Sequence, residues 1–495
     1  MAQQNELLEL QNGSDVRGVA LPTPSGKPVN LTAEAACRIA GGFAQWLKKR
    51  TGKEAPRIGV GHDSRVTAED LKRAVFRGLS AQGVRGVDCG LASTPAMFMG
   101  TVFPETAFDG SIMITASHLP RERNGLKFFT KDGGLDKGDI RAVLELAGDI
   151  PPAETPVDVP SSDLMDLYAI SLRDKITAGV GDGKRPLEGL HIVVDAGNGV
   201  GGFFVTDVLG PLGAKCTGSQ FLEPDGNFPN HIPNPEDKTA MDSIRKAVLA
   251  NQADLGIIFD TDGDRMSAVL SDGEGVNRDA IIAMMAAILA PDYPGSTIVT
   301  DSVTSDRLTD FLAGLGLKHR RFKRGYKNVI NEAIRLNAEG TLTPLAIETS
   351  GHGAMKENYF LDDGAYLAVK LITAAARMRR EGKKLESLIA ALPPAGEALE
   401  RRIPISGADT AAYGAQVLEA FRTRAEERGY TLADTCEGVR LTWPGEGWLL
   451  LRMSLHDPLL PLNVESMAPG GCGKFLAAAE ELLAGFDRLD LSVLH

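Results

Sequence analysis

The chain has 495 residues, a formal net charge of −12 and five cysteines. At roughly 100–200 residues per domain, this length predicts three or four domains, each able to bury its own core. The negative charge argues against a nucleic-acid-binding surface, so an anionic substrate must be held by specific residues. The cysteines are odd in number, far apart and without a Cys-x-x-Cys pair, which argues against a disulfide framework and a structural zinc site.

The apolar segments are too short for a membrane span. A span needs about 18 or more consecutive apolar residues, and no segment of the sequence approaches that length. The N-terminus has no basic region leading into an apolar one. We therefore expect a cytoplasmic protein with no membrane partner, and either a monomer or a homodimer is compatible with the sequence.

Strand-like and helix-like segments alternate along most of the chain. This alternation predicts open, mostly parallel α/β sheets, in which ligands bind beyond the carboxyl ends of the strands. The helix-like segment 67–81 follows the first of these strands. The expected strands, each of which runs into a polar or glycine-containing loop, are 57–61, 110–115, 191–195, 255–260 and 296–301.

Three features suggest domain boundaries. The proline-rich segment 150–160 is typical of a linker, an aspartate cluster ends the second α/β unit, and a Pro-Pro pair within 392–396 ends the third. The last hundred residues place two strand-like runs between two helical patterns, which predicts an α+β module. We predict three related mixed α/β sheet domains followed by a smaller α+β C-terminal domain, with the ranges 1–155, 156–266, 267–395 and 396–495.

The first segment that carries chemistry is Thr115-Ala-Ser-His-Leu-Pro120. Ser117 offers a hydroxyl nucleophile at the end of a strand, and His118 beside it offers a base or a phosphate-binding donor. A Ser-His pair alone is more often an ordinary turn or helix cap.

The second segment is Phe259-Asp-Thr-Asp-Gly-Asp-Arg265. In an extended loop, a spacing of two points alternate side chains the same way, so Asp260, Asp262 and Asp264 can converge on one hard cation. A solvated acidic loop is the alternative, but the fully apolar strand that leads into the cluster favours a metal site. An EF-hand is unsupported because Ser271 stands where its last glutamate would be.

The third segment is Glu348-Thr-Ser-Gly-His352. The carboxylate of Glu348, the hydroxyl of Ser350 and the imidazole of His352 together suit a sugar ring, whose adjacent hydroxyls need both donors and acceptors. A polar turn is the alternative for this segment taken alone.

The glycine-rich stretch 197–202 satisfies much of a dinucleotide-binding fingerprint, because it follows a strand and precedes Glu223 by about twenty residues. Nothing nearby resembles a hydride-transfer site. Glycines that allow close packing on a sheet are a sufficient structural reason for this stretch.

Read in chain order, these segments resemble the α-D-phosphohexomutase family, which includes phosphoglucomutases, phosphomannomutases and phosphoglucosamine mutases. The resemblance covers essentially the whole chain. The matching motifs are Gly13 to Gly18, Gly61 to Arg65, Gly110 to Lys127, Asp225 to Asn230 with Pro233 to Glu236, Asp260 to Arg265, and Glu348 to His352.

The resemblance implies a role for each matched residue. Ser117 would carry the phosphate, and Asp260, Asp262 and Asp264 would hold Mg²⁺ against it. Phosphoryl transfer needs mainly positioning and cations that neutralise the equatorial oxygens, and this set supplies both. The implied proton-transfer and charge-stabilising residues are His118 and Lys127, with Arg17 and Arg265 near the transferred group, and Glu348 and Ser350 on sugar hydroxyls. The implied substrate is a hexose phosphate, glucose or mannose, converted through a bisphosphorylated sugar.

Two departures from the family pattern stand out. Leu119 replaces the family asparagine beside the nucleophile. In the C-terminal module, the family phosphate loop Arg-Pro-Ser-Gly-Thr-Glu-Pro is Arg452-Met-Ser-Leu-His-Asp-Pro458 here. Arg452 and Ser454 are retained for phosphate binding, and His456 replaces the threonine as a further expected donor.

Three alternatives remain open. Asp260-Thr-Asp-Gly also resembles the haloacid-dehalogenase signature, which would make Asp260 the phosphorylated residue of a phosphatase or phosphotransferase, although Asp264 stands where that signature has threonine. Leu119 and the altered Arg452 loop suggest a non-catalytic sugar-phosphate-binding paralogue, against which the retained Ser117 argues. An oxidoreductase built on the glycine-rich stretch is the third.

Overall fold

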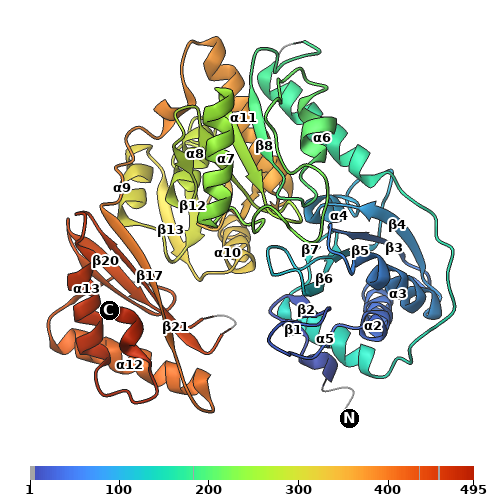
Figure 1. Cartoon of the computed structure of the whole chain (residues 1–495), viewed down its shortest axis with the longest axis horizontal. Coiled ribbons are helices and arrows are strands. Elements are labelled where there is room, and N and C mark those ends of the chain that lie inside the picture. The colour runs from blue at the N-terminus through green and yellow to red at the C-terminus, as the bar shows by residue number, and fades with distance from the viewer. Residues whose placement is uncertain (1–5, 182, 434, 455–456) are drawn as a thin grey trace. The chain divides into compact units, whose positions relative to one another are not determined.

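The computed structural model describes residues 6–181, 183–433, 435–454 and 457–495 (Figure 1). His456, expected to bind phosphate, lies outside the described residues. The chain divides into two compact units, and each is described here by itself. Unit 1 comprises Met1–Ile288 and Ser350–Ser387, and unit 2 comprises Leu289–Thr349 and Leu388–His495.

Unit 1 begins with a mixed sheet in the order β1-β2-β6-β5-β3-β4, with β7 paired to β6. β5 is parallel to β3 and antiparallel to β6. The elements are β1 (Gln11–Asn12), β2 (Asp15–Val19), α2 (Ala33–Thr51), β3 (Arg57–His62), α3 (Ala68–Ala81), β4 (Arg85–Leu91), α4 (Thr94–Met99), β5 (Gly110–Ile114), β6 (Arg123–Thr130), β7 (Gly133–Gly134) and α5 (Lys137–Gly148).

Helices cover both faces of this sheet, and β3 shows why. Along a strand, alternate side chains point to opposite faces. Ile58 and Val60 join the core that α2, α3 and α5 close. On the other face, a Cβ on Gly59 would lie 2.4 Å from the ring of Phe108, and a Cβ on Gly61 would lie 2.5 Å from Met97 of α4. The glycines thus admit these large side chains.

The second sheet of unit 1 has the order β11-β10-β9-β8. β8 and β9 are parallel and consist of buried residues, as expected for strands covered on both faces. β10 and β11 extend the sheet past residue 266, the expected end of the second domain. The elements are α6 (Leu164–Val180), β8 (Ile192–Asp195), η1 (Phe204–Leu209), α7 (Lys238–Asn251), β9 (Leu255–Phe259), β10 (Met266–Leu270) and β11 (Gly275–Val276).

The next segment of the chain contributes to both units. α8 (Asp279–Leu289) ends at the division between them. In unit 2, β12 pairs in parallel with β13 and β14; the elements are β12 (Thr297–Asp301), α9 (Asp306–Gly314), β13 (Lys318–Phe322), α10 (Tyr326–Ala338) and β14 (Leu345–Ile347). In unit 1, β15 and β16 form an antiparallel pair; the elements are β15 (Gly353–Met355), η2 (Lys356–Asn358), β16 (Leu361–Asp362) and α11 (Gly364–Arg380). The short helix η3 spans Leu385–Leu388.

The C-terminal part of unit 2 is an antiparallel sheet in the order β17-β21-β20-β19-β18, packed against two helices. β17 was not expected, because its sequence has no apolar run; along the strand, half-buried and exposed residues alternate up to the buried Ile403. The elements are β17 (Glu397–Pro404), α12 (Thr410–Glu427), β18 (Thr431–Ala433), β19 (Val439–Trp443), β20 (Gly447–Leu451), β21 (Leu459–Ser466), α13 (Cys472–Leu483) and η4 (Leu491–Leu494).

These elements confirm the predicted fold class, with mixed α/β sheets followed by an α+β C-terminal module. The expectation of mostly parallel sheets was wrong for both sheets of unit 1, where hairpins add antiparallel neighbours to the parallel strands. The predicted domain ranges stay a prediction. Within the described residues, no helix is both long and apolar enough to cross a membrane.

Candidate active site

Ser117 lies in the loop between β5 and β6, and its backbone is in the left-handed region with φ of 50°. This conformation is unfavourable for a residue with a Cβ, at a cost on the order of 1 kcal/mol. The N–H of Ser117 donates to the hydroxyl of Thr115 at 2.8 Å. Arg17 donates to the carbonyl of Thr115 at 2.8 Å and is paired with Asp15. Local contacts therefore hold the strained turn.

The hydroxyl of Ser117 meets three side chains. It donates to Asp260 Oδ2 at 2.9 Å, accepts from Arg265 Nη2 at 3.1 Å, and lies 3.3 Å from Nδ1 of His118. The positive charge of Arg265, together with burial, holds the pKa of His118 well below its usual value. The environment of His118 therefore favours the neutral form of the imidazole.

The aspartate loop joins β9 to β10 and is buried throughout. Oδ1 of Asp260 accepts hydrogen bonds from the backbone N–H groups of Gly263 and Arg265, which closes the loop, and Gly263 has a φ of +74°. Asp260, Asp262 and Asp264 each offer one carboxylate oxygen, and these oxygens lie within 4.8 Å of one another. The predicted convergence of the three side chains is therefore present.

Lys127 of β6 compensates part of this negative charge. Its ammonium donates to Asp262 at 2.9 Å and to Asp264 at 2.5 Å. Burial opposes the charge of Lys127, but the two carboxylates raise its pKa well above the usual value. Burial and the charges of Asp264 and Asp262 raise the pKa of Asp260 well above the usual carboxyl range. Arg265 Nε also donates to Asp260 at 3.0 Å, so two cations face three carboxylates and one negative charge remains.

The remaining charge fits a divalent cation. Oδ1 of Asp262 and Oδ1 of Asp264 are buried and have no hydrogen-bond partner among the residues that the structure describes. An unpartnered buried carboxylate oxygen is costly, and hard cations such as Mg²⁺ bind carboxylate oxygens. Asp260, Asp262 and Asp264 are therefore suited to hold a metal ion.

The glycine-rich stretch supports the aspartate loop. A Cβ on Gly199 would lie 2.5 Å from the carbonyl oxygen of Thr261, and Val200 N–H donates to that carbonyl at 2.9 Å. Gly197 has a φ of +53°. The glycines therefore have a packing role against the aspartate loop.

His352 belongs to unit 1, as does Ser350. Gly351 has a φ of +90°, and a Cβ there would lie 2.6 Å from the carbonyl oxygen of Met266. His352 is thereby held beside the aspartate loop, with Nδ1 2.5 Å from Asp362 and 4.0 Å from Asp264. Burial alone would lower the pKa of His352, but Asp362 and Asp264 raise it to about 9.

Sequence reasoning missed Thr94. Its hydroxyl donates to Asp262 Oδ2 at 2.5 Å, and its N–H donates to the carbonyl of Asp262 at 2.9 Å. Ser93 caps α4 and Pro95 follows Thr94, which is a recognisable helix start, but such a signal names no distant partner.

The other expected substrate-binding residues lie in unit 2. Glu348 accepts a hydrogen bond from Gly325 N–H at 2.7 Å. Arg452 is buried and donates to its neighbour's carbonyl at Met453, while burial and the charge of Arg324 lower its pKa. The hydroxyl of Ser454 accepts from Asp457 N–H at 3.2 Å. The binding roles of these residues stay a prediction.

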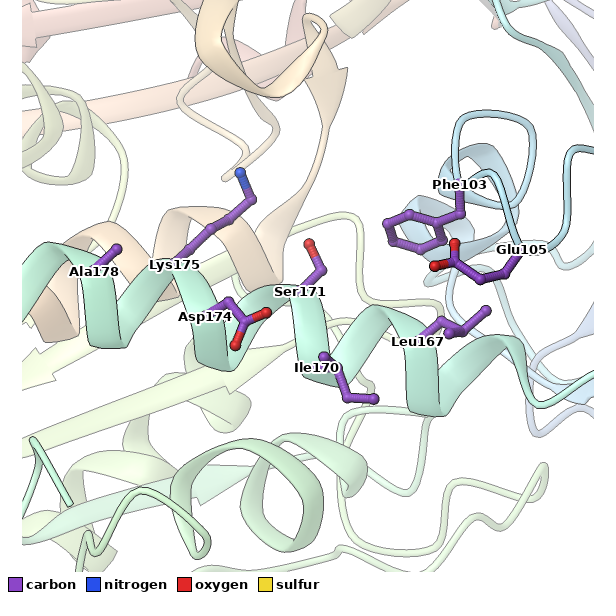
Figure 2. A pocket seen from close by; sticks show the side chains of 8 residues that line it. All are labelled: Phe103, Glu105, Leu167, Ile170, Ser171, Asp174, Lys175 and Ala178. Carbon is purple, nitrogen blue, oxygen red and sulfur yellow. The ribbon is translucent and has the colours of Figure 1, made fainter. Parts of the chain in front are cut away.

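A groove of about 480 Å³ lies elsewhere in unit 1, along α6 (Figure 2). Side chains of α6 form one wall, and Phe103 and Glu105 lie across from them. The lining residues are Phe103, Glu105, Leu167, Ile170, Ser171, Asp174, Lys175 and Ala178. None of them is a candidate site residue.

Models described as phosphoglucomutase/phosphomannomutase α/β/α domains I, II and III match residues 9–146, 172–273 and 277–395. The chain belongs to the phosphoglucomutase/phosphomannomutase family. This membership confirms the resemblance seen in the motifs, and it makes the protein a phosphotransferase of the mutase class.

Relatives of this phosphoglucomutase/phosphomannomutase family member match along most of its length. It is 29% identical over 460 residues to a phosphomannomutase/phosphoglucomutase of Pseudomonas aeruginosa, covering 91% of this chain and 90% of that protein. It is 31% identical over 459 residues to a phosphoglucomutase/phosphomannomutase of Thermococcus kodakarensis, covering 92% and 95%. The solved structure of a family protein from Burkholderia thailandensis matches with a TM-score of 0.78 and 26% identity, covering 98% of both chains.

Proposed function

We propose that the protein interconverts hexose 1-phosphate and hexose 6-phosphate, with glucose, mannose or both as the sugar, through a phosphate carried on Ser117. The observation that carries this proposal is the position of the Ser117 hydroxyl. This hydroxyl contacts both Asp260 of the aspartate loop and the guanidinium of Arg265. A phosphate on this oxygen would meet both an arginine and the proposed Mg²⁺ ligands, as phosphoryl transfer requires.

In this proposal the protein's own residues position and neutralise the transferred group. Asp260, Asp262 and Asp264 would hold Mg²⁺, which would supply positive charge to the phosphoryl group. Arg265 donates to the same oxygens, and Lys127 keeps the paired carboxylates charged. Preorganised charges of this kind stabilise the transition state without reorganisation.

The proton balance is carried by groups beside Ser117. In the forward step, a sugar hydroxyl attacks phosphorus, the bond between phosphorus and the Ser117 oxygen breaks, and Ser117 recovers a proton. His118 accepts the proton of the attacking hydroxyl and passes it to the Ser117 oxygen as that oxygen leaves phosphorus. The product is a sugar bisphosphate, which turns around and returns its other phosphate to Ser117.

Substrate binding draws on the remaining predicted residues. Glu348, Ser350 and His352 bind sugar hydroxyls, and Arg452 with Ser454 binds the phosphate that does not react, as a bidentate guanidinium can. The names of the relatives support glucose and mannose phosphates as the first substrates to test.

The test is turnover of single substrates followed by ³¹P NMR. Glucose 1-phosphate or mannose 1-phosphate is incubated with enzyme, MgCl₂ and a trace of the matching 1,6-bisphosphate. We expect the 6-phosphate signal to appear and Ser117→Ala to lose nearly all turnover. Ser111→Ala is the matched control, because Ser111 is a buried serine of β5 whose hydroxyl donates to the carbonyl of Met97, away from the aspartate loop. Equal turnover by Ser117→Ala and wild type would reject the proposal.

A further inference from the structure

Arg65, in the loop after β3, is buried directly behind the serine loop. Its two terminal nitrogens donate to four backbone carbonyls that all belong to the segment from Ser117 to Arg123. Nη1 lies 2.9 Å from each of two of these oxygens, and Nη2 lies 2.6 Å from a third; the four carbonyls are those of Ser117, Leu119, Pro120 and Arg123. One guanidinium thus ties the whole turn together.

Asp63 holds the same turn from its other end. Its Oδ2 lies 3.2 Å from Arg65 Nε and accepts a hydrogen bond from the Thr115 hydroxyl at 2.7 Å. The Thr115 oxygen in turn accepts from Ser117 N–H at 2.8 Å. The N–H and the carbonyl of Ser117 are therefore both linked to one buried ion pair.

We propose that Asp63, Arg65 and Thr115, here named the serine clamp, are positioning residues that hold Ser117 in its left-handed conformation. The inference rests on the proposed role of Ser117 as the phosphate carrier. Arg65 and Thr115 bond to the backbone of the turn, Asp63 links these two residues, and the clamp acts through the direction of the Ser117 side chain. Because phosphoryl transfer depends on alignment, a small rotation of this turn would move the oxygen away from Asp260 and Arg265.

Stability alone is a poor reason for such a pair. Burial lowers the pKa of Arg65 and raises that of Asp63, so each charge is costly without the other. Buried ion pairs often contribute little net stability compared with apolar residues of similar volume. Only the planar fork of arginine can serve several carbonyls at fixed angles, which lysine cannot do. The directed contacts of Arg65 with the turn therefore explain the buried Asp63–Arg65 ion pair better than its net contribution to stability does.

The clamp also explains how the turn tolerates Leu119. Arg65 binds the carbonyl of residue 119, not its side chain. A polar side chain at this position is therefore not required to keep the turn in shape. Leucine in place of the family asparagine therefore leaves the contacts of Arg65 with the backbone of the serine turn intact.

A second loop of unit 1 covers the clamp. The ring of Phe228 lies 5.4 Å from the guanidinium carbon of Arg65, a cation–π distance. A Cβ on Gly226 would lie 2.5 Å from both the Ser64 carbonyl oxygen and the Val66 nitrogen. The motif Asp225 to Asn230, which the sequence links to the family, thus packs against the clamp.

The first test compares two buried arginines. Arg65→Lys keeps the charge but loses the fork, and we expect kcat to fall about 10²-fold while KM for the sugar phosphate is unchanged. Arg38→Lys is the matched control, because Arg38 is also buried in unit 1 and donates to the carbonyls of Ala147 and Gly148, away from the serine loop. It should lower the unfolding temperature without lowering kcat.

The second test does not depend on whether Arg65→Lys folds. Thr115→Val has nearly the same shape but removes the hydroxyl between Asp63 and Ser117, whereas Thr115→Ser retains it. We expect Thr115→Val to lower kcat and to reduce the fraction of protein with phosphate on Ser117, measured by intact mass, and Thr115→Ser to restore both.

The outcomes separate the clamp from the proposed function. If Ser117→Ala is inactive while Arg65→Lys or Thr115→Val turns over like wild type, the positioning role is overturned and the role of Ser117 stands. An equal loss of kcat in Arg38→Lys would also overturn it, because general destabilisation would then suffice. If Ser117→Ala remains active, the proposed function fails, independently of the clamp.

Discussion

The hydroxyl of Ser117 donates a hydrogen bond to Asp260 across 2.9 Å, although 143 positions separate the two residues. The contact joins the loop after β5 to the loop after β9, and both loops follow strands of unit 1. The proposed nucleophile and the aspartate loop thus meet at strand ends, where open α/β sheets bind their ligands.

Two buried oxygens of the aspartate loop, Oδ1 of Asp262 and Oδ1 of Asp264, accept no hydrogen bond within the described part of the chain. They predict that bound metal stabilises the fold. We expect MgCl₂ to raise the unfolding temperature of the wild type, with a stabilisation of about 2.7 kcal/mol at a metal concentration 100 times Kd. Asp262→Asn should lose most of this gain, since it removes a ligand charge. Asp195→Asn, a buried carboxylate outside the loop, should keep it. The same gain in Asp262→Asn and wild type would contradict the metal role.

Lys127 should matter most when metal is absent. Lys127→Met leaves Asp262 and Asp264 without their ammonium partner, and breaking a buried pair in this way costs about 3–5 kcal/mol. We expect Mg²⁺ to recover part of this loss, because the cation supplies the missing charge. Lys72→Met, which removes a buried partner of Glu69 and Asp88, should be destabilised equally with and without metal. Calorimetric scans with EDTA or MgCl₂ make the comparison, and a metal-independent loss in Lys127→Met would count against the account.

The pair of His231 and Asp195 predicts a pH-dependent stability. Nε2 of His231 lies 3.0 Å from both Asp195 oxygens, and although burial lowers the pKa of His231, the hydrogen bond and charge of Asp195 raise it overall. A raised pKa stabilises the fold below the unfolded value of about 6.5, and this contribution disappears as pH rises through the higher folded pKa. His231→Gln should therefore lower the unfolding temperature more at pH 6 than at pH 9. At pH 6 the loss in the free energy of unfolding should be about 1.5–3 kcal/mol, the contribution of a hydrogen bond to a charged group. A pH-independent difference would show that the charge plays no part.

Arg452 predicts an effect on substrate binding. If its guanidinium binds the non-reacting phosphate, Arg452→Ala should raise KM by roughly 10–100-fold, because hydrogen bonds to charged groups contribute about 1.5–3 kcal/mol. Arg452→Lys should lie between Arg452→Ala and wild type, since it keeps the charge but not the fork. Initial-rate kinetics with one sugar phosphate measures both. An unchanged KM in Arg452→Ala would remove this loop from the phosphate site.

The sequence allowed the aspartate loop to be predicted because the chemistry is local. Three aspartates spaced by two follow one apolar strand, and the structure brings their oxygens together. Lys127 and Arg265 were found through family motifs, and their contacts with Asp262 and Ser117 fit those motifs. Residues that are close in the sequence stay close in the fold, so a short motif indicates directly which side chains can meet.

Contacts between distant segments could not be predicted in the same way. Thr94 lies 168 positions from Asp262, and no local pattern links them. Arg65 was part of a recognised motif, but its four carbonyl partners depend on the path of another loop. The antiparallel placing of β6 was missed because an apolar run does not reveal the direction of its neighbours.

Ser117 is proposed to carry the transferred phosphate, and phosphopeptide mapping tests this role most directly. The protein is incubated with MgCl₂ and ³²P-labelled hexose 1,6-bisphosphate, digested, and treated in parallel with acid or hydroxylamine. We expect one acid-stable phosphopeptide that contains Ser117, and Ser117→Ala should lack it. Hexose 1-phosphate added before digestion should remove the label from the enzyme. A hydroxylamine-labile phosphate on Asp260 would contradict it and make the aspartate the nucleophile.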